Sequence, residues 1–346
     1  MSELNYSLAL LMAATTGLSL ASTTVQARGE VNVYSARKEA LIAPALEAYS
    51  KEYHVQVNLI TGDADTLLHR LKMEGDASPA DVFITVDAGR LHRAKEEGVL
   101  RKIESNTIKE VIPTHLRDSE DYWVSLSQRA RVIFYNPKKV TKEELSTYED
   151  LANPKWQGRI CTRSSSNIYN QSLIASMIAA DGAEATGQWI KGFVANLARP
   201  PFGGDTDLLR AVEAGVCDIT LANTYYYGRL GHSDDPAMKS VYNNVALFWP
   251  NQAEGERGAH VNVSGIGITN SATNVRNARR LIEFLVNHES QEWYAEVNNE
   301  YPVIEGVAYP STLEPFGTFK ADTLQLDKLG ENNRLATELM DANGWK

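Results

Sequence analysis

The feature that most constrains the fold is a regular alternation of short apolar runs with longer amphipathic segments. In the first third of the chain this pattern predicts strands at residues 31–34, 55–60 and 81–85, which are followed by helices at 37–53, 65–74 and 88–97. Strands that alternate with helices of about 10–15 residues are typical of βαβ units on a mainly parallel sheet. We therefore expect an α/β protein, and 346 residues correspond to about two domains.

The two domains are expected to be interwoven rather than strung along the chain. A second α/β block begins near residue 159, and the strand predicted at 124–135 is long enough to run from one domain into the next. No flexible linker separates the blocks, so the chain is expected to visit each domain more than once. We expect an N-terminal lobe of residues 28–127 plus 247–305 and a C-terminal lobe of residues 128–246 plus 306–346.

Composition and net charge limit the kind of protein this chain can be and the kind of partner it can bind. Hydrophobic residues make up 43% of the chain, which excludes disordered and low-complexity classes. The 34 basic and 44 acidic residues give a formal charge of −10, without a basic stripe. This balance argues against nucleic acid as a partner. We expect a monomer that binds no nucleic acid.

The amino terminus has the pattern of an export signal. Residues 8–21 are apolar or small, and Val25-Gln26-Ala27 forms a small-x-small cleavage site. An apolar region followed by such a site is typical of a secretory signal peptide. We therefore expect residues 1–27 to be removed after export, although the first seven residues lack the usual Lys or Arg. The alternative is a first core helix.

Two cysteines, Cys161 and Cys217, lie in or beside short strand-like runs. An even number of cysteines in an exported chain permits a disulfide. Two buried thiols that act as small apolar side chains are the other interpretation. Both stay open at this stage.

Three consecutive tyrosines directly follow the strand predicted at 218–221. Tyr225, Tyr226 and Tyr227 lie within the run NTYYYGR. Neighbouring helical positions point about 100° apart, so the three phenols cannot all join one core face. Ligands of α/β proteins bind outside the carboxyl ends of strands. The run therefore indicates a binding site, and partly buried tyrosines covering a strand end are the alternative.

Further polar groups follow other strands. Tyr169 lies in a serine-rich turn that opens a helix, and the free backbone N–H groups of such a turn favour an anion. Arg129 and Arg131 lie two positions apart on the strand at 124–135, so they share a face. A free phenol has a pKa near ~10 and loses its proton at neutral pH only to a strongly polarising cation. Fe³⁺ is the obvious candidate, because Ca²⁺ and Mg²⁺ sites use carboxylates and waters.

A family resemblance rests on six co-linear motifs that span the mature chain. They are VYSAR at 33–37, SPADV at 78–82, RARVI at 129–133, RS with NIYN at 163–170, NTYYYGR at 223–229 and EYPV at 300–303. With these motifs the chain resembles the periplasmic ferric-ion-binding proteins of bacterial iron ABC transporters, the bacterial transferrin group of type II periplasmic binding proteins. The resemblance implies two α/β lobes, joined by crossing hinge strands, with a ligand cleft between them.

The resemblance also implies the site and its partners. Fe³⁺ would be held by Tyr169, Tyr225 and Tyr226, and a companion anion such as carbonate by Arg129 with Ser164 and Ser165. The side chains expected to adjust the basicity of the phenolates without binding iron are Tyr227, Arg229 and Arg131. Many members add a His or Tyr from the loop after the first strand, but here the loop reads Arg37-Lys38-Glu39, which leaves Glu39 a weak candidate ligand.

A protein of this group is a periplasmic receptor without catalytic activity. It delivers iron to an inner-membrane ABC permease and its ATPase. Another solute, such as thiamine, a phosphonate, sulfate or a polyamine, is the alternative within the same class. An enzyme that uses Tyr169 or one of the serines at 164–166 is the third possibility, but no general base is placed beside these residues.

Overall fold

The computed structural model describes residues 29–346. The predicted signal peptide, residues 1–27, lies outside the described residues. Within 29–346, no helix has both the length and the apolar character required to cross a membrane.

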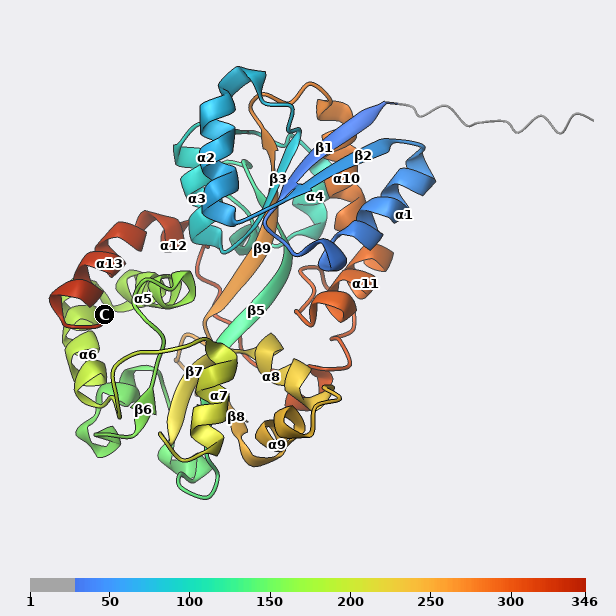
Figure 1. The fold of residues 1–346 in the computed structure, drawn as a ribbon. Coiled ribbons are helices and arrows are strands. Elements are labelled where there is room, and N and C mark those ends of the chain that lie inside the picture. The colour runs from blue at the N-terminus through green and yellow to red at the C-terminus, as the bar shows by residue number, and fades with distance from the viewer. Residues whose placement is uncertain (1–28) are drawn as a thin grey trace, which may run out of the picture.

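A single strongly curled sheet runs through the molecule, with helices packed around it (Figure 1). The strands are β1 Glu30–Ser35, β2 Gln56–Thr61, β3 Val82–Val86, β4 Leu100–Arg101, β5 Val124–Tyr135, β6 Ile160–Cys161, β7 Ile219–Asn223, β8 Ala246–Phe248 and β9 Val261–Thr269. Their order is β2-β1-β3-β9-β5-β7-β6, while β4 pairs with β9 and β8 pairs with β5. The predicted βαβ units appear as parallel pairs of β1 with β2, β1 with β3 and β6 with β7.

Strand β5 connects the two ends of this sheet. Residues 124–130 pair with β9, and from Arg131 onward the strand pairs instead with β7 and β8. Figure 1 shows β5 and β9 running between an upper group of elements around β1 to β3 and a lower group around β6 to β8. Arg129 and Arg131 therefore lie where β5 changes its partners. The exact limits of the two lobes stay a prediction.

Thirteen α-helices of the described residues cover the sheet. They are α1 Ala43–Tyr53, α2 Ala64–Glu74, α3 Ala88–Glu96, α4 Asn106–Val111, α5 Ile168–Asp181, α6 Ala183–Ala195, α7 Asp205–Glu213, α8 Thr224–Gly231, α9 Pro236–Asn244, α10 Val275–Leu285, α11 His288–Asn298, α12 Asp327–Glu331 and α13 Asn333–Ala342. The single helix predicted at 37–53 is wrong in its first part. A separate 3₁₀ turn occupies Glu39–Leu41, and α1 begins only at Ala43 because Pro44 fits the first turn of a helix but not its interior.

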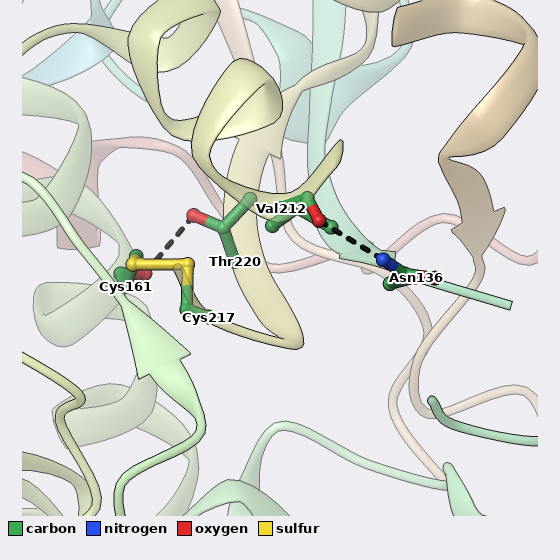
Figure 2. The surroundings of a disulfide bond; sticks show 5 residues. All are labelled: Asn136, Cys161, Val212, Cys217 and Thr220. Carbon is green, nitrogen blue, oxygen red and sulfur yellow. Dashed lines mark hydrogen bonds between the residues drawn. A yellow bond between two sulfur atoms is a disulfide. The ribbon is translucent and has the colours of Figure 1, made fainter. Parts of the chain in front are cut away.

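The two cysteines form a disulfide between neighbouring strands (Figure 2). Cys161 ends β6, and Cys217 lies just before β7. The hydroxyl of Thr220 on β7 also donates to the carbonyl oxygen of Cys161 at 3.0 Å. The bond therefore joins the two strands that lead, at their carboxyl ends, to the turn before Tyr169 and to the tyrosine run.

Candidate metal centre

The tyrosine run forms the start of helix α8. Strand β7 ends at Asn223 and α8 begins at Thr224, so all three tyrosines lie in the first turn of the helix. The rings of Tyr225 and Tyr226 lie together, with centroids 4.3 Å apart. Tyr227 packs instead against Phe134, and its hydroxyl lies within hydrogen-bonding distance of two carbonyl oxygens near the end of α9, those of Tyr242 and Val245. The structure thus does not bring Tyr227 to the other phenols.

Tyr169 comes from a second helix to meet this pair. It lies in the first turn of α5, where the side chain of Asn167 caps the helix by accepting a hydrogen bond from the Tyr169 backbone N–H. The hydroxyl of Tyr225 donates to the hydroxyl of Tyr169 at 3.3 Å. Phenols that follow β6 and β7 therefore converge at one edge of the sheet, as expected for ligands at the carboxyl ends of parallel strands.

Burial keeps the phenols of Tyr225 and Tyr226 protonated. It raises the pKa of Tyr225 well above its ordinary value, and the neighbouring Tyr169 and Tyr226 raise it further, while Arg129 lowers it. The pKa of Tyr226 is raised for the same reasons, by burial first and then by Tyr169. At neutral pH these two phenols are neutral, and a highly charged cation would be needed to convert them into anions.

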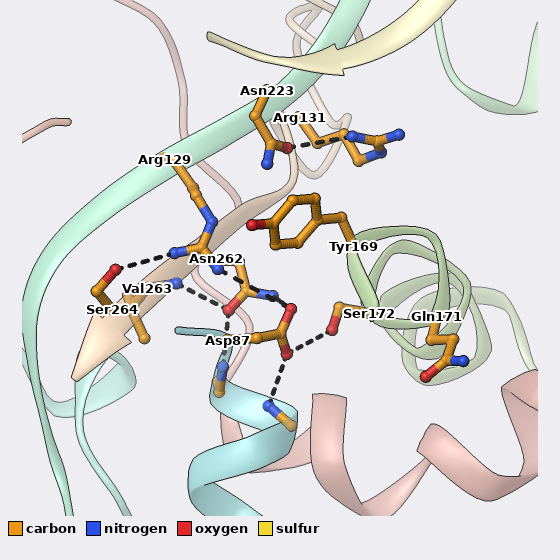
Figure 3. Close-up of polar contacts among 12 residues, drawn as sticks. Asp87, Arg129, Arg131, Tyr169, Gln171, Ser172, Asn223, Asn262, Val263 and Ser264 are labelled. Atoms are coloured by element: carbon orange, nitrogen blue, oxygen red, sulfur yellow. Dashed lines mark hydrogen bonds and ion pairs between the residues drawn. The ribbon is translucent and has the colours of Figure 1, made fainter. Parts of the chain in front are cut away.

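Arg129 has the unsatisfied donors expected of an anion site. The side chain is 2% exposed, and its guanidinium lies 5.2 Å from the centre of the Tyr169 ring. Its Nη1 donates to Ser264 at 3.3 Å, while Nε and Nη2 are buried without a hydrogen-bond partner among the described residues. Buried donors are rarely left without an acceptor, so this edge of the guanidinium suits an anion. Figure 3 shows the Tyr169 phenol oxygen pointing toward this guanidinium.

The two serines of the predicted anion site lie on the turn before α5. The hydroxyl of Ser164 is bonded to the hydroxyl of Ser166 at 3.0 Å, and the carbonyl oxygen of Ser165 accepts a hydrogen bond from Gln171. Both serines are partly exposed. In the described part of the chain neither has a hydrogen bond to Arg129 or to a phenol.

Arg131 and Arg229 have structural partners. The Arg131 guanidinium donates to Asp205 at 3.0 Å, to Asn170 at 2.9 Å and to the carbonyl oxygen of Leu221 at 3.1 Å, so it ties β5 to α5, α7 and β7. Arg229 donates to the carbonyl oxygen of Asn298, and its guanidinium lies 5.1 Å from the centre of the Tyr225 ring. Of these two, only Arg229 is shown in contact with a candidate ligand.

Two buried carboxylates, Asp87 and Asp205, lie beside the candidate site and were not identified from the sequence. Asp205 also accepts a hydrogen bond from Arg163 at 3.0 Å and from the backbone of Asn223, so it fixes the end of β7. Asp87 follows β3, accepts hydrogen bonds from Ser172 of α5 and Asn262 of β9, and lies 4.0 Å from Arg129 (Figure 3). Burial raises the pKa of Asp87, and Arg129 opposes that rise. The available signal was its place directly after a buried strand.

In the loop after β1, Arg37 points toward the interior, whereas Glu39, the candidate ligand considered from the sequence, does not. Glu39 is exposed and lines a hollow between α1 and β2, so the structure does not place it with the phenols. Arg37 points inward instead, where it is 6% exposed and donates to Ser264 at 2.7 Å and to Glu300 at 3.2 Å. It thereby adds a second buried arginine near Arg129.

This fold and site define a class. A curled α/β sheet with two crossing strands, and polar side chains gathered where those strands change partners, is the type II periplasmic-binding-protein fold of solute receptors. The chain belongs to the bacterial extracellular solute-binding proteins, whose family model matches residues 77–320.

Relatives and solved structures agree on the fold. "Iron uptake protein A1" of Synechocystis sp. is 50% identical over 317 residues, which cover 92% of this chain and 88% of the relative. The "Major ferric iron-binding protein" of Neisseria meningitidis is 26% identical over 92% of this chain and 94% of the relative. A Trichodesmium protein solved in complex with iron and citrate superposes with a TM-score of 0.89 at 50% identity, covering 92% of this chain and all of that one. The Campylobacter jejuni ferric binding protein gives a TM-score of 0.84 at 37% identity, over 91% and 100%. The fold class predicted from the sequence is confirmed.

Proposed function

We propose that this chain is a receptor that captures ferric iron between its lobes and delivers it to a membrane permease. The observation that carries the proposal is the convergence of Tyr169, Tyr225 and Tyr226 beside the buried Arg129. The names of the relatives, which refer to iron uptake and ferric iron binding, support the same cargo. The protein has no catalytic role in this proposal.

The three phenols would bind the cation as phenolates. Fe³⁺ is a hard, strongly polarising ion, and it would replace the phenol protons that burial retains on Tyr225 and Tyr226. Three phenolates balance the three charges of the ion, so a companion anion needs a positive partner of its own. Arg129 supplies one, with its unpartnered Nε and Nη2.

Carbonate is the companion anion that we propose, held by Arg129 with the turn at Ser164 and Ser165. The Trichodesmium protein was solved with citrate as well as iron, which makes a hydroxycarboxylate the other anion to test. Ser164 and Ser165 would act through the turn that precedes α5, since free N–H groups at such a turn accept anions.

Closure of two lobes would complete the site. We propose the lobe limits given above, residues 28–127 plus 247–305 and 128–246 plus 306–346, with β5 and β9 as hinge strands. A hollow of about 1010 Å³ opens beside the site and is lined by residues of α3, the start of α5 and α12, among them Arg90, Ser166 and Gln171. This hollow is the proposed path by which the cargo enters.

The cellular setting follows from the same proposal. The receptor would act as a monomer in the periplasm, after removal of residues 1–27, and would dock on an inner-membrane ABC permease with its ATPase. A relative from Serratia marcescens is named as a periplasmic Fe(3+)-binding protein. The disulfide between Cys161 and Cys217 suits an oxidising compartment.

The visible spectrum tests the proposal directly. Iron-free protein mixed with a ferric chelate and bicarbonate should turn orange-red through phenolate-to-iron charge transfer, with one iron per chain. Thiamine, a phosphonate, sulfate and a polyamine serve as comparison ligands in thermal-shift measurements. A colourless protein that is stabilised by one of these compounds and not by ferric iron would contradict the proposal.

A further inference from the structure

The buried carboxylate of Glu300 is linked to two buried arginines, directly to Arg37 and through Ser264 to Arg129. Glu300, just after α11, is 3% exposed and accepts hydrogen bonds from Arg37 at 3.2 Å and from the hydroxyl of Ser264 at 3.3 Å. Ser127 also donates to it. The Ser264 hydroxyl in turn accepts from both Arg37 and Arg129, so it uses all of its hydrogen-bonding capacity.

This group of side chains joins the chain segments that cross at the centre of the molecule. Ser127 and Arg129 belong to β5 and Ser264 to β9, while Glu300 belongs to the segment that follows α11. That segment is held to β5 by two backbone hydrogen bonds between Tyr301 and Gln128, of 2.7 and 2.8 Å. The segment that carries Glu300 is therefore hydrogen-bonded to the strand that carries Arg129.

The charges explain why Glu300 stays ionised in this place. Burial acts to raise the pKa of Glu300, but Arg37 and Arg129 overcome this effect and hold the pKa below its ordinary value. An ionised acceptor makes stronger hydrogen bonds than a neutral one, and it lowers the cost of burying two guanidinium groups.

Arg129 has a competing partner on its other side. The Asp87 carboxylate lies 4.0 Å from Arg129 Nη2, which is too far for a hydrogen bond but close enough for attraction. The bond from Arg129 Nη1 to Ser264 holds the guanidinium away from Asp87. Without that bond, the Arg129 guanidinium could turn toward Asp87. Its Nε and Nη2 would then pair with this internal carboxylate and not with an anion.

We propose that Glu300 is a positioning residue for the companion anion. With Arg37, and through Ser264, it holds the Arg129 guanidinium so that Nε and Nη2 remain available to the anion that accompanies Fe³⁺. The inference rests on the proposed function and adds to it a residue that sets anion affinity without touching iron.

Two variants test this role in the full-length mature protein. Glu300→Gln removes the charge, and Ser264→Ala removes the link between Glu300 and Arg129 while leaving both charges in place. The iron-loaded protein is titrated with bicarbonate, and separately with citrate, while the phenolate-to-iron band is followed. We expect each variant to need at least about tenfold more anion for half of the band change, as for loss of a hydrogen bond to a charged group. At saturating anion the band itself should match that of wild type, because the tyrosines are unchanged.

The control is Glu74→Gln. Glu74 is also bonded to an arginine, a serine and a tyrosine hydroxyl, namely Arg70, Ser78 and Tyr34, but it lies outside this network. Its anion requirement should equal that of wild type. In an Arg129→Lys background, Glu300→Gln should add little further loss, because its effect passes through Arg129.

Each other outcome has a definite meaning. An unchanged anion requirement in both Glu300→Gln and Ser264→Ala overturns the inference, and so do fully additive effects with Arg129→Lys. If the wild-type protein binds iron equally well with and without the anion, the inference about Glu300 is overturned, but the proposed capture of iron is not. Absence of any phenolate band in wild type contradicts the proposed function itself. If Glu300→Gln does not fold by circular dichroism, Ser264→Ala decides the question.

Discussion

The hydroxyl oxygens of Tyr169 and Tyr225 lie 3.3 Å apart, although the two residues begin different helices. Two neutral phenols can share a hydrogen bond at this distance, but two phenolates so close would repel each other. A bound cation would offset this repulsion between the two oxygens. In the proposed function, iron capture is therefore accompanied by the loss of protons.

The first prediction concerns the tyrosine run itself. Tyr225→Phe and Tyr226→Phe should each weaken ferric iron binding by more than about 100-fold, the upper range for loss of an outer partner of a metal ligand. Competition with a chelator of known affinity measures the change. Tyr227→Phe is the matched control, because its hydroxyl is bonded to carbonyl oxygens near α9. It should keep the iron band and cost about 1 kcal/mol of unfolding free energy.

The second prediction concerns protons. Burial raises the pKa of Tyr225 and Tyr226, so both are protonated at neutral pH and must lose their protons to bind iron. Affinity should therefore rise with pH and fall as the solution is acidified, by about tenfold per pH unit for each proton released. Iron added to weakly buffered protein with an indicator dye gives the proton count. Tyr225→Phe should release fewer protons per bound iron than wild type, and equal release would contradict this assignment.

The third prediction concerns Arg131, which the structure shows as a buried structural cation. Arg131→Met should lower the unfolding free energy by about 3 kcal/mol, the lower range for breaking a buried ion pair, because Asp205 keeps Arg163 as a partner. Urea denaturation measures the loss. Arg334→Gln removes an exposed arginine paired with Glu338, and should leave stability within experimental error. Equal stabilities for the two variants would show that Arg131 has no such role.

The fourth prediction concerns the disulfide. A bond between residues 56 positions apart should contribute about 4 kcal/mol to the unfolding free energy by restricting the unfolded chain. Cys161→Ala with Cys217→Ala should lose about that amount in urea denaturation. The folded double variant should still bind iron, because β6 and β7 remain paired in parallel.

Much of the fold could be predicted because its elements are local patterns. The alternation of apolar runs identified β1, β2, β3 and the long β5. The start of α1 was misplaced, since Pro44 was not recognised as a first-turn residue. The pairing of β5 with β9 and then with β7 depends on contacts between distant segments, which no local pattern contains.

The candidate site also contains some residues that a local sequence pattern could indicate and others that it could not. Adjacent phenols after a strand form a local pattern, so the sequence alone could identify Tyr225 and Tyr226 as candidate ligands. Asp87, Asp205 and Glu300 are single carboxylates that gain meaning only when folding brings arginines beside them. The sequence also could not show that Tyr227 turns toward Phe134, because the direction depends on where α8 packs.

The cross-link between β6 and β7 also shortens the path along the chain between the proposed iron ligands. Along the chain, Tyr169 and Tyr225 are 225 − 169 = 56 residues apart, but through the disulfide they are (169 − 161) + (225 − 217) = 16 residues apart. Bringing two points of a flexible chain together costs less entropy when the connecting segment is shorter. By the logarithmic dependence on segment length, the difference is about 1 kcal/mol. In the oxidised unfolded chain, the two phenols of the proposed site are therefore already held closer together than in the reduced chain.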